Sequence, residues 1–395
     1  MKEPLLLNTF HIIIDGLFGS VPILLSFMIL SFGAEEKDAG LIMSLASLII
    51  TLAGLSTAFF SRHFGLFQTT AIIMLLYGIG FFTNAFSQNI YLSGFFFILS
   101  TAGFSVFHNT AFSYLTVNSG KHSLGKAIGN FTALGDIGRI PLTSLSAFIA
   151  ALPVLGFPGW RAICLLYGLS AFVCAAYLLV SSRRSPKAIL TEGLPASKKK
   201  AYFPAFLLRE RQYALPILAA ILDAIGSNQV FVFLPFLLFA KGIDPKILGS
   251  FAFAFTFGCL LGKASLGRLV DQFGNRKIFM ISEILMSLLL ILLIVSHHLF
   301  LIVGASFLLG IVTKGTVPVI QTIITEPAQE KQEYDNIFSL NSFACGIANI
   351  LSPLLLGFIA SALGIHWSFA LMAFAAICAV LPILVMKRQG EPLDG

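Results

Sequence analysis

Long apolar runs alternate along the chain with short breaks that hold charged residues, glycine or proline. Each run has roughly 20 mostly apolar residues, the length that a helix needs to cross the hydrocarbon core of a membrane. Typical breaks are the charged stretch at 35–38 and the pair Pro158-Gly159. The pattern predicts twelve membrane-spanning helices, at residues 8–31, 40–60, 68–86, 91–116, 127–151, 161–182, 213–239, 246–268, 278–296, 299–324, 335–362 and 366–386.

Composition supports a membrane protein. Of the 395 residues, 57% are hydrophobic and only 11% are charged, whereas a soluble domain has about 25% charged residues. The polar residues are therefore too few to cover a soluble protein of this length. All five cysteines lie inside apolar runs, so we interpret them as small buried side chains and not as disulfides or metal ligands.

Basic residues are distributed unequally between the two sets of predicted loops. With the N-terminus placed in the cytoplasm, eighteen lie on the inner side. This bias is typical of cytoplasmic loops, so both termini are predicted to be cytoplasmic. The cytoplasmic loops therefore account for the net charge of +7, which does not indicate a nucleic-acid partner. The outer side has only Lys37, Arg161, Lys241 and Lys246.

The polar segment 183–212 divides the predicted helices six to six. We interpret it as a cytoplasmic basic linker between two bundles, at 1–182 and 213–395. The halves also resemble each other, because a proline followed by a tryptophan recurs at corresponding positions, as Pro141 with Trp160 and Pro353 with Trp367.

Internal repeats of this kind are typical of transporters whose halves move about a central site. The expected fold is therefore an all-α membrane protein with twelve transmembrane helices in two pseudo-symmetric six-helix bundles.

Seven charged residues interrupt the apolar runs. A charge at the centre of a bilayer costs roughly 2.5–3.5 kcal/mol on insertion scales, so one that is kept there usually has a function or a compensating partner. The seven are Asp15, Asp136, Arg139, Asp223, Lys263, Glu283 and Lys314.

The first-half candidates lie on three predicted helices. His11 and Asp15 are four residues apart, hence on one helix face. They form either a proton-holding pair or a packing pair near the inner surface. His108 and Asn109 are the candidates in the span 91–116.

Asp136 and Arg139 are three residues apart and can pair. The pair either fixes helix packing, or a substrate anion displaces Asp136 from Arg139. The neighbouring glycines Gly129, Gly135 and Gly138 permit close helix contact.

In the second half, Asp223 is followed by polar residues that include Asn228. Together they predict a polar face on a helix that lines a cavity. Lys314 is too far from either end of its helix to reach the surface easily, which indicates a cavity residue. Lys263 and Glu283 are expected to pair or to extend toward the inner surface.

The loop after the span 246–268 carries a motif of glycines, an acid and basic residues: Gly267, Asp271, Gly274, Arg276 and Lys277. It resembles the signature loop of the major facilitator superfamily. The resemblance implies a gating role, in which the glycines allow close helix approach and Asp271 latches one conformation at a helix N-terminus. The first-half copy has Arg62 where the acid is expected, so we expect gating to rely on Asp271.

Three segments of the first half carry a narrower resemblance: HIIID at 11–15, FHNTA at 107–111 and SGKHSLG at 119–125. They are similar to the fosmidomycin-resistance group of drug–proton antiporters. Asn109 departs from that group, which has proline there. Arg139-Ile140 before Pro141 also departs from its Gly-Pro motif.

These observations favour a proton-coupled secondary transporter of a small organic solute, working by alternating access. Arg139 and Lys314 favour an anionic or polar solute, and the resemblance implies efflux by antiport. The candidate proton carriers are Asp15, Asp136 and Asp223. We expect no enzymatic activity, no cofactor, no metal centre and no nucleic-acid partner. The expected form is a monomer in a bacterial-type cytoplasmic (inner) membrane.

Three alternatives stay open. The first is an importer of a metabolite or metal chelate, such as a siderophore, on the same scaffold. The second is a metal-ion transporter, since the spacing of His11 and Asp15 suits ligands, but no Cys or His partner is evident in the span 213–239. The third, a sensor or scaffold, is disfavoured by the short loops.

Overall fold

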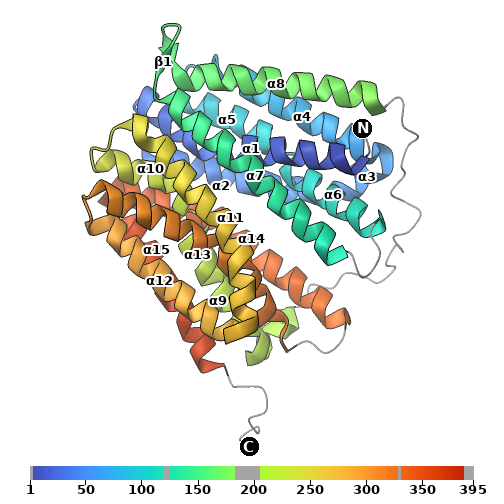
Figure 1. Cartoon of the computed structure of the whole chain (residues 1–395), viewed down its shortest axis with the longest axis vertical. Helices are drawn as coiled ribbons and strands as arrows, with labels where there is room; N and C mark the ends of the chain where they lie inside the picture. The colour runs from blue at the N-terminus through green and yellow to red at the C-terminus, as the bar shows by residue number, and fades with distance from the viewer. Residues whose placement is uncertain (1–2, 119–123, 183–204, 328–330, 387–395) are drawn as a thin grey trace, which may run out of the picture.

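The described part of this computed structural model, residues 3–118, 124–182, 205–327 and 331–386, is almost entirely helical (Figure 1). The first half contains α1 (Glu3–Phe32), α2 (Glu36–Gly54), α3 (Thr57–His63), α4 (Gly65–Asn84), α5 (Ile90–Thr101), α6 (Phe104–Asn118), α7 (Leu124–Ala150) and α8 (Gly159–Ser182). The second half contains α9 (Arg211–Ser227), α10 (Val230–Ala240), α11 (Leu248–Phe273), α12 (Asn275–Val295), α13 (Leu299–Thr325), α14 (Lys331–Leu363) and α15 (Ile365–Val385), with 3-10 turns η1 (Ala205–Arg209) and η2 (Pro245–Ile247).

Within the described residues, eleven spans are long and apolar enough to cross a membrane. The predicted twelfth, α7, has 27 residues but includes Asp136 and Arg139, which lower its apolar content. It packs lengthwise on α1 and on α11. Each of the twelve predicted spans therefore corresponds to a helix or to a pair of consecutive helices.

Three predicted spans are not continuous helices. The span 40–60 breaks between α2 and α3, the span 91–116 between α5 and α6, and the span 213–239 between α9 and α10. Hydrophobicity does not report such breaks, because the flanking residues stay apolar. Broken helices are tolerated at membrane depth where protein surrounds them.

The helices group by chain half (Figure 1). In the first half α1 packs on α7 and α4 on α8, and in the second half α11 packs on α13 and α15 on α9 and α12. The two groups meet through α2 with α14 and α7 with α11. They lie close together around α10 and β1 (Pro153–Val154) and diverge toward the side of α3 and the N-terminus.

The joined end of the two bundles, where α2 meets α14, is closely packed. The backbone N–H of Lys37 donates to Ser361 Oγ at 2.8 Å, and Ser44 Oγ donates to the carbonyl of Ile350 at 2.6 Å. Between them, a Cβ at Gly40 would collide with the backbone of Pro353. Glycine is therefore required for this helix contact.

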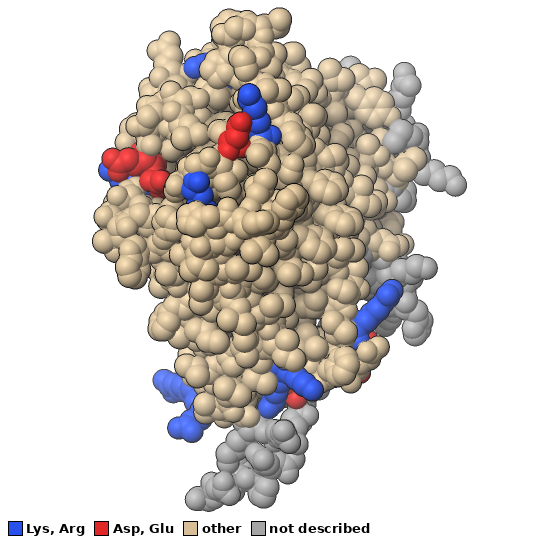
Figure 2. Space-filling model, turned by 60° about the vertical axis from the view of Figure 1, so that its left-hand side comes forward, with Lys and Arg blue, Asp and Glu red and all other residues tan. Residues whose placement is uncertain are grey.

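The outer surface agrees with a membrane protein. Figure 2 shows charged side chains near the two ends of the molecule, with a wide uncharged band between them. Two of the four basic residues predicted for the outer side cover helix ends: Arg161 donates to the carbonyls of Ala85 and Ser87, and Lys241 to those of Ile294 and Ser296.

A short hairpin between α7 and α8 was not predicted from the sequence. Strand β1 pairs with β2 (Phe157–Pro158) in antiparallel register. Leu155 and Gly156 form the connecting turn, both with positive φ, as a tight two-residue hairpin turn requires. Leucine rarely adopts this conformation, which hid the turn from sequence analysis.

Some predictions fall outside the described residues. They include most of the linker, at 183–204 with its run Lys198-Lys199-Lys200, and residues 119–123 of the segment at 119–125. The division into 1–182, 183–212 and 213–395 stays a prediction.

Candidate functional site

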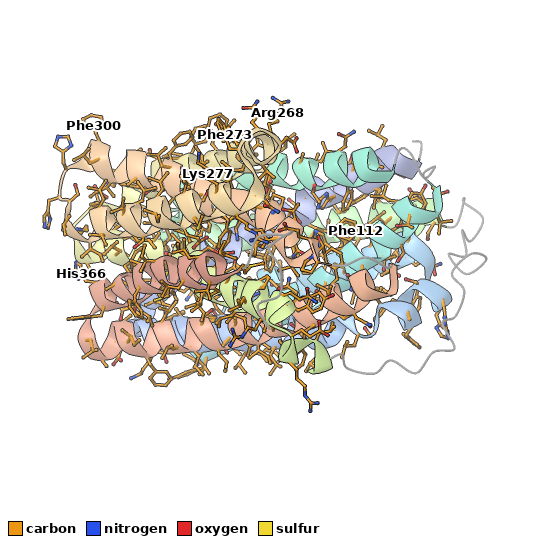
Figure 3. All side chains as sticks on the ribbon, turned by 90° about the horizontal axis from the view of Figure 1, so that it is seen from below. Phe112, Arg268, Phe273, Lys277, Phe300 and His366 are labelled. Atoms are coloured by element: carbon orange, nitrogen blue, oxygen red, sulfur yellow. The ribbon has the colours of Figure 1, made fainter. Side chains whose placement is uncertain are left out.

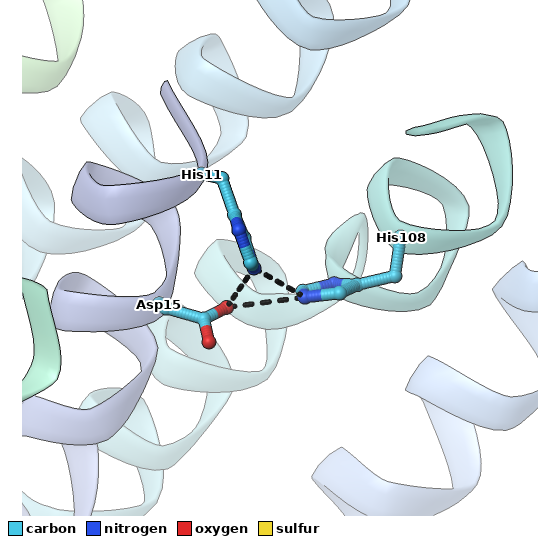
Figure 4. Close-up of side chains that lie close together, drawn as sticks. All are labelled: His11, Asp15 and His108. Atoms are coloured by element: carbon cyan, nitrogen blue, oxygen red, sulfur yellow. Dashed lines mark hydrogen bonds and ion pairs between the residues drawn. The ribbon is translucent and has the colours of Figure 1, made fainter. Parts of the chain in front are cut away.

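His11, Asp15 and His108 meet in the interior of the first bundle (Figure 4). His108 Nε2 lies 3.1 Å from Asp15 Oδ1 and 3.2 Å from His11 Nε2. His11 Nε2 lies 3.5 Å from Asp15 Oδ1. His11 and Asp15 are almost fully buried, at 1% and 6% exposure. The helical spacing of His11 and Asp15 thus brings them together, as expected, and α6 contributes the third member.

Local structure positions these three side chains. His108 follows the break between α5 and α6, and its Nδ1 lies 3.0 Å from the carbonyl of Phe104. The ring of His11 stacks on Phe131 of α7, with centroids 3.8 Å apart. On α7, a Cβ at Gly135 would collide with Asp15 and His11. The predicted role of this glycine in close helix contact is therefore observed.

Charged side chains continue from this cluster into the second bundle. Arg139 Nη2 lies 3.0 Å from Asp15 Oδ2, and Arg139 Nη1 lies 3.4 Å from Asp136 Oδ1. Asp136 Oδ2 in turn accepts from Lys263 Nζ of α11 at 2.6 Å. Asp136 is buried, whereas the Lys263 side chain is 34% exposed. The result is a chain of alternating charges that joins α1, α7 and α11, and thereby the two bundles.

Lys314 of α13 lies close enough to Arg139 and Lys263 for electrostatic repulsion between them. Its Nζ donates to Asn228 Oδ1 at 3.1 Å, and Asn228 Nδ2 donates to Asn349 Oδ1 at 2.8 Å. Asn228 lies at the break between α9 and α10. Three cations, Arg139, Lys263 and Lys314, thus lie near one another between the bundles, and we call them the cationic group.

A second buried acidic site lies in the second bundle. The carboxyl groups of Asp223 of α9 and Glu283 of α12 lie close to each other. Both are buried, at 5% and 0% exposure. Thr316 Oγ1 donates to Asp223 Oδ1 at 3.4 Å. Among the described residues, no donor bonds the Glu283 oxygens, so this pair needs a shared proton.

Asp223 was predicted from the sequence as a cavity residue, whereas Glu283 was expected to pair or to extend toward the inner surface. The two residues are 60 positions apart on helices that the sequence alone does not place together. The signal in the sequence that pointed to Glu283 was its charge within an apolar run.

Asn109 does not join the His11–Asp15–His108 cluster. It is exposed, and its Nδ2 donates to Thr57 Oγ1 of α3 at 3.2 Å. Because it directly follows His108 on α6, its side chain points about 100° around the helix from that of His108. Asn109 is therefore not a member of the cluster.

The predicted gating loop forms the turn between α11 and α12. Gly274 has φ +86° and permits the turn, but nothing lies within 4 Å of a Cβ at Gly267, so close helix approach does not explain that glycine. Asp271 is exposed, whereas Arg276 lies 3.4 Å from Glu326 at the end of α13. In Figure 3 Lys277 lies at this turn with Arg268 and Phe273, and it lies over the Phe273 ring.

An apolar cavity of about 470 Å³ lies between α9 and α14. Among its lining residues only Ser352 is polar, and none of the predicted site residues lines it. It includes Ile217, Ile221, Ile225, Ile347 and Leu351. Its chemistry therefore differs from that of the charged clusters.

Comparisons with known proteins agree with this architecture. Residues 216–394 match the family model described as Major Facilitator Superfamily. Comparison with curated protein sequences gave no match.

Solved structures with the same fold cover nearly the whole chain. A bacterial homolog of the human lysosomal transporter Spinster, inward-facing and unoccupied, is 14% identical with a TM-score of 0.74, and the match covers 98% of this chain and 96% of that one. A D-xylose-proton symporter is 15% identical with a TM-score of 0.75, covering 98% and 99%. The nucleoside transporter NupG is 13% identical with a TM-score of 0.73, covering 97% and 98%. The chain is therefore an all-α membrane protein with the major facilitator fold.

Proposed function

We propose that this chain is a proton-coupled secondary transporter of a small organic anion, working by alternating access between its two bundles. The observation that carries the proposal is the cationic group, Arg139, Lys263 and Lys314, between the bundles. Within the described residues, its direct carboxylate partners are Asp136, which contacts Arg139 and Lys263, and Asp15, which contacts Arg139. A solute carboxylate or phosphate would find several donors there.

Solute binding would replace one carboxylate by another. Asp136 now joins Arg139 of α7 to Lys263 of α11. An anionic solute that takes the place of Asp136 would contact both bundles at once. Lys314, held only by the amide oxygen of Asn228 among the described contacts, is free to turn toward the solute.

For proton coupling we favour Asp223 among the predicted carriers. Two adjacent buried carboxyl groups cannot both be ionised at low cost, so Asp223 and Glu283 share a proton. Loss of that proton would leave a negative charge that attracts Lys314, which already interacts electrostatically with Asp223. Lys314 would then leave the solute. Proton release and solute binding would thus compete for one cation, so this step alone would carry the solute and the proton in the same direction.

The expectation of efflux by antiport requires proton and solute to exclude each other, the opposite of this step, and the direction of proton flux relative to solute flux decides between them. A monomer, a bacterial-type inner membrane and cytoplasmic termini enter the proposal unchanged. The resemblance to the fosmidomycin-resistance group supports efflux by antiport. The signature-like loop between α11 and α12 supports a gating role for Asp271.

Transport can be tested in proteoliposomes that contain a pH-sensitive dye. Under an imposed pH gradient, a panel of carboxylates and phosphate esters is added, with neutral sugars and amines as controls. We expect at least one anion to drive proton flux and Lys314→Ala to raise its half-saturating concentration at least about tenfold. Flux driven only by neutral or cationic solutes would contradict the proposal. Repeating the assay with both membrane orientations distinguishes efflux from import.

A further inference from the structure

Three ligand-type atoms of the first bundle surround one point. The pairwise separations among His11 Nε2, His108 Nε2 and Asp15 Oδ1 are 3.1, 3.2 and 3.5 Å, and Figure 4 shows them as a closed triangle. In a tetrahedral zinc site with bonds of about 2.0–2.1 Å, two ligand atoms are about 3.3 Å apart. One ion can therefore contact all three atoms at ordinary bond lengths.

The histidine rings are oriented as ligands. The Nδ1–H of His108 points at the carbonyl of Phe104, at 3.0 Å, which leaves the lone pair of its Nε2 directed into the triangle. Metal-bound histidines usually make such a second bond to a carbonyl or carboxylate. The His11 ring is fixed by its stacking on Phe131 at 3.8 Å.

The carboxylate also has a free ligand atom. Asp15 is 6% exposed, and its Oδ2 is held by Arg139 at 3.0 Å. Its Oδ1 is buried and lies 3.1 Å from His108 Nε2 and 3.5 Å from His11 Nε2, and it accepts no hydrogen bond within the described parts of the chain when both of these nitrogens are unprotonated. In that state the buried oxygen has no donor, which is costly, and an ion between the three atoms would satisfy it.

We propose that His11, Asp15 and His108 bind one divalent transition-metal ion of the zinc type, with a fourth position open to water or a solute oxygen. Two imidazoles and one carboxylate suit Zn²⁺, Co²⁺ or Ni²⁺, whereas Mg²⁺ and Ca²⁺ take oxygen ligands. The site lies beside the cationic group but does not depend on the transport proposal.

The surrounding charges predict reversible binding. Arg139 and Lys263 offset Asp15 and Asp136 in the chain of ion pairs. No surplus negative charge attracts the ion, so its three direct bonds must provide the affinity. Such a site releases its ion more easily than one with several unpaired acids.

The test uses the full chain, purified in detergent, freed of its affinity tag and stripped of metal by a chelator. Co²⁺ is titrated and followed by visible absorption. We expect one ion per chain with the strong bands of four-coordinate Co²⁺, displaced by Zn²⁺ and not by Mg²⁺. His108→Gln and Asp15→Asn should weaken Co²⁺ binding at least about tenfold, since even changes to groups that only orient ligands cost 10–100-fold.

Two further variants keep the result interpretable. His298→Gln changes an exposed histidine at the start of α13 and should bind Co²⁺ as the wild type does. His108→Cys retains a ligand atom and should restore binding with a new thiolate absorption band. The absence of saturable Co²⁺ binding, or equal affinity in wild type and His108→Gln, would overturn the proposal. Either result leaves the anion-driven proton flux to be decided separately.

Discussion

At the scale of single residues, two glycines on α7 decide how closely α7 can approach the His11–Asp15–His108 cluster. A Cβ at Gly135 would meet the carboxylate of Asp15 and the ring of His11, and one at Gly138 would meet the backbone of Ile12. Helix α1 can therefore approach α7 only because these positions are glycine.

Gly135→Ala should lower the free energy of unfolding by about 1–3 kcal/mol, because overpacking forces neighbouring groups to move. Thermal unfolding in detergent measures the change. The matched control is Gly267→Ala on the exposed face of α11, where nothing lies within 4 Å of the new Cβ. That change should stabilise by about 0.5–1 kcal/mol. Similar effects at both positions would refute the packing argument.

Glu283→Gln should keep the fold but remove proton coupling. The amide is nearly isosteric and can donate a hydrogen bond to Asp223, so the two side chains can stay in contact without a shared proton. We expect solute exchange across liposomes at equal pH to continue while solute-driven proton flux is lost. Retention of proton flux would exclude the Asp223–Glu283 pair as the carrier.

Residue pairs within one helix were predictable from the sequence, and pairs between helices were not. Spacing of three or four residues indicated Asp136 with Arg139 and His11 with Asp15. No spacing rule links Asp136 to Lys263, 127 positions away in the other bundle. That contact requires the docking of α7 on α11, which hydrophobic periodicity does not encode.

At the scale of elements, polar site residues occur at or just after breaks in helices. His108 lies soon after the α5–α6 break, and Asn228 lies in the α9–α10 break. The sequence predicted the positions of the spans because apolar length is a strong signal. It missed the breaks because they replace a few backbone hydrogen bonds without changing the hydrophobicity.

The α11–α12 turn gives a prediction about gating. Asp271 is exposed in the conformation with diverging helix ends, so a latch made by it belongs to the opposite conformation. Asp271→Asn should then favour the diverged form by about 1 kcal/mol, roughly fivefold in population.

Spin labels at exposed Val117 of α6 and Phe338 of α14 would report this shift as a larger fraction of long distances. Arg268→Gln, an exposed change three positions earlier, is the control and should leave the distribution unchanged. A distribution in Asp271→Asn that matches the wild type would argue against the latch.

At the scale of the whole molecule, the joined end formed by α2 and α14 holds one conformation. A disulfide there should trap it. In a chain without its five native cysteines, Lys37→Cys with Ser361→Cys should oxidise readily, since the backbone nitrogen of Lys37 and Ser361 Oγ are 2.8 Å apart.

Oxidation should stop the anion-driven proton flux, and reduction should restore it, because alternating access requires this end to separate. Either single-cysteine variant serves as the control and should keep its flux under oxidant. Full flux in the fully cross-linked protein would be incompatible with rocking of the bundles.

The overall architecture was largely predictable, since twelve apolar runs, a central polar segment and a signature-like loop all indicated the major facilitator fold. The sequence could not predict which ends of the bundles meet. That choice depends on close contacts such as Gly40 against Pro353, and helices of similar apolarity give no hint of them.

The link between Asp136 and Lys263 lies near the middle of both α7 and α11. With a rise of about 1.5 Å per residue, the ends of these helices are about 20 Å from that point, so tilting one bundle by about 10° moves the ends by about 3–4 Å. The mid-height bond, close to the pivot, hardly lengthens. The bond can therefore persist in both the inward-facing and the outward-facing conformation. It then responds to solute binding and not to which side of the membrane the site faces.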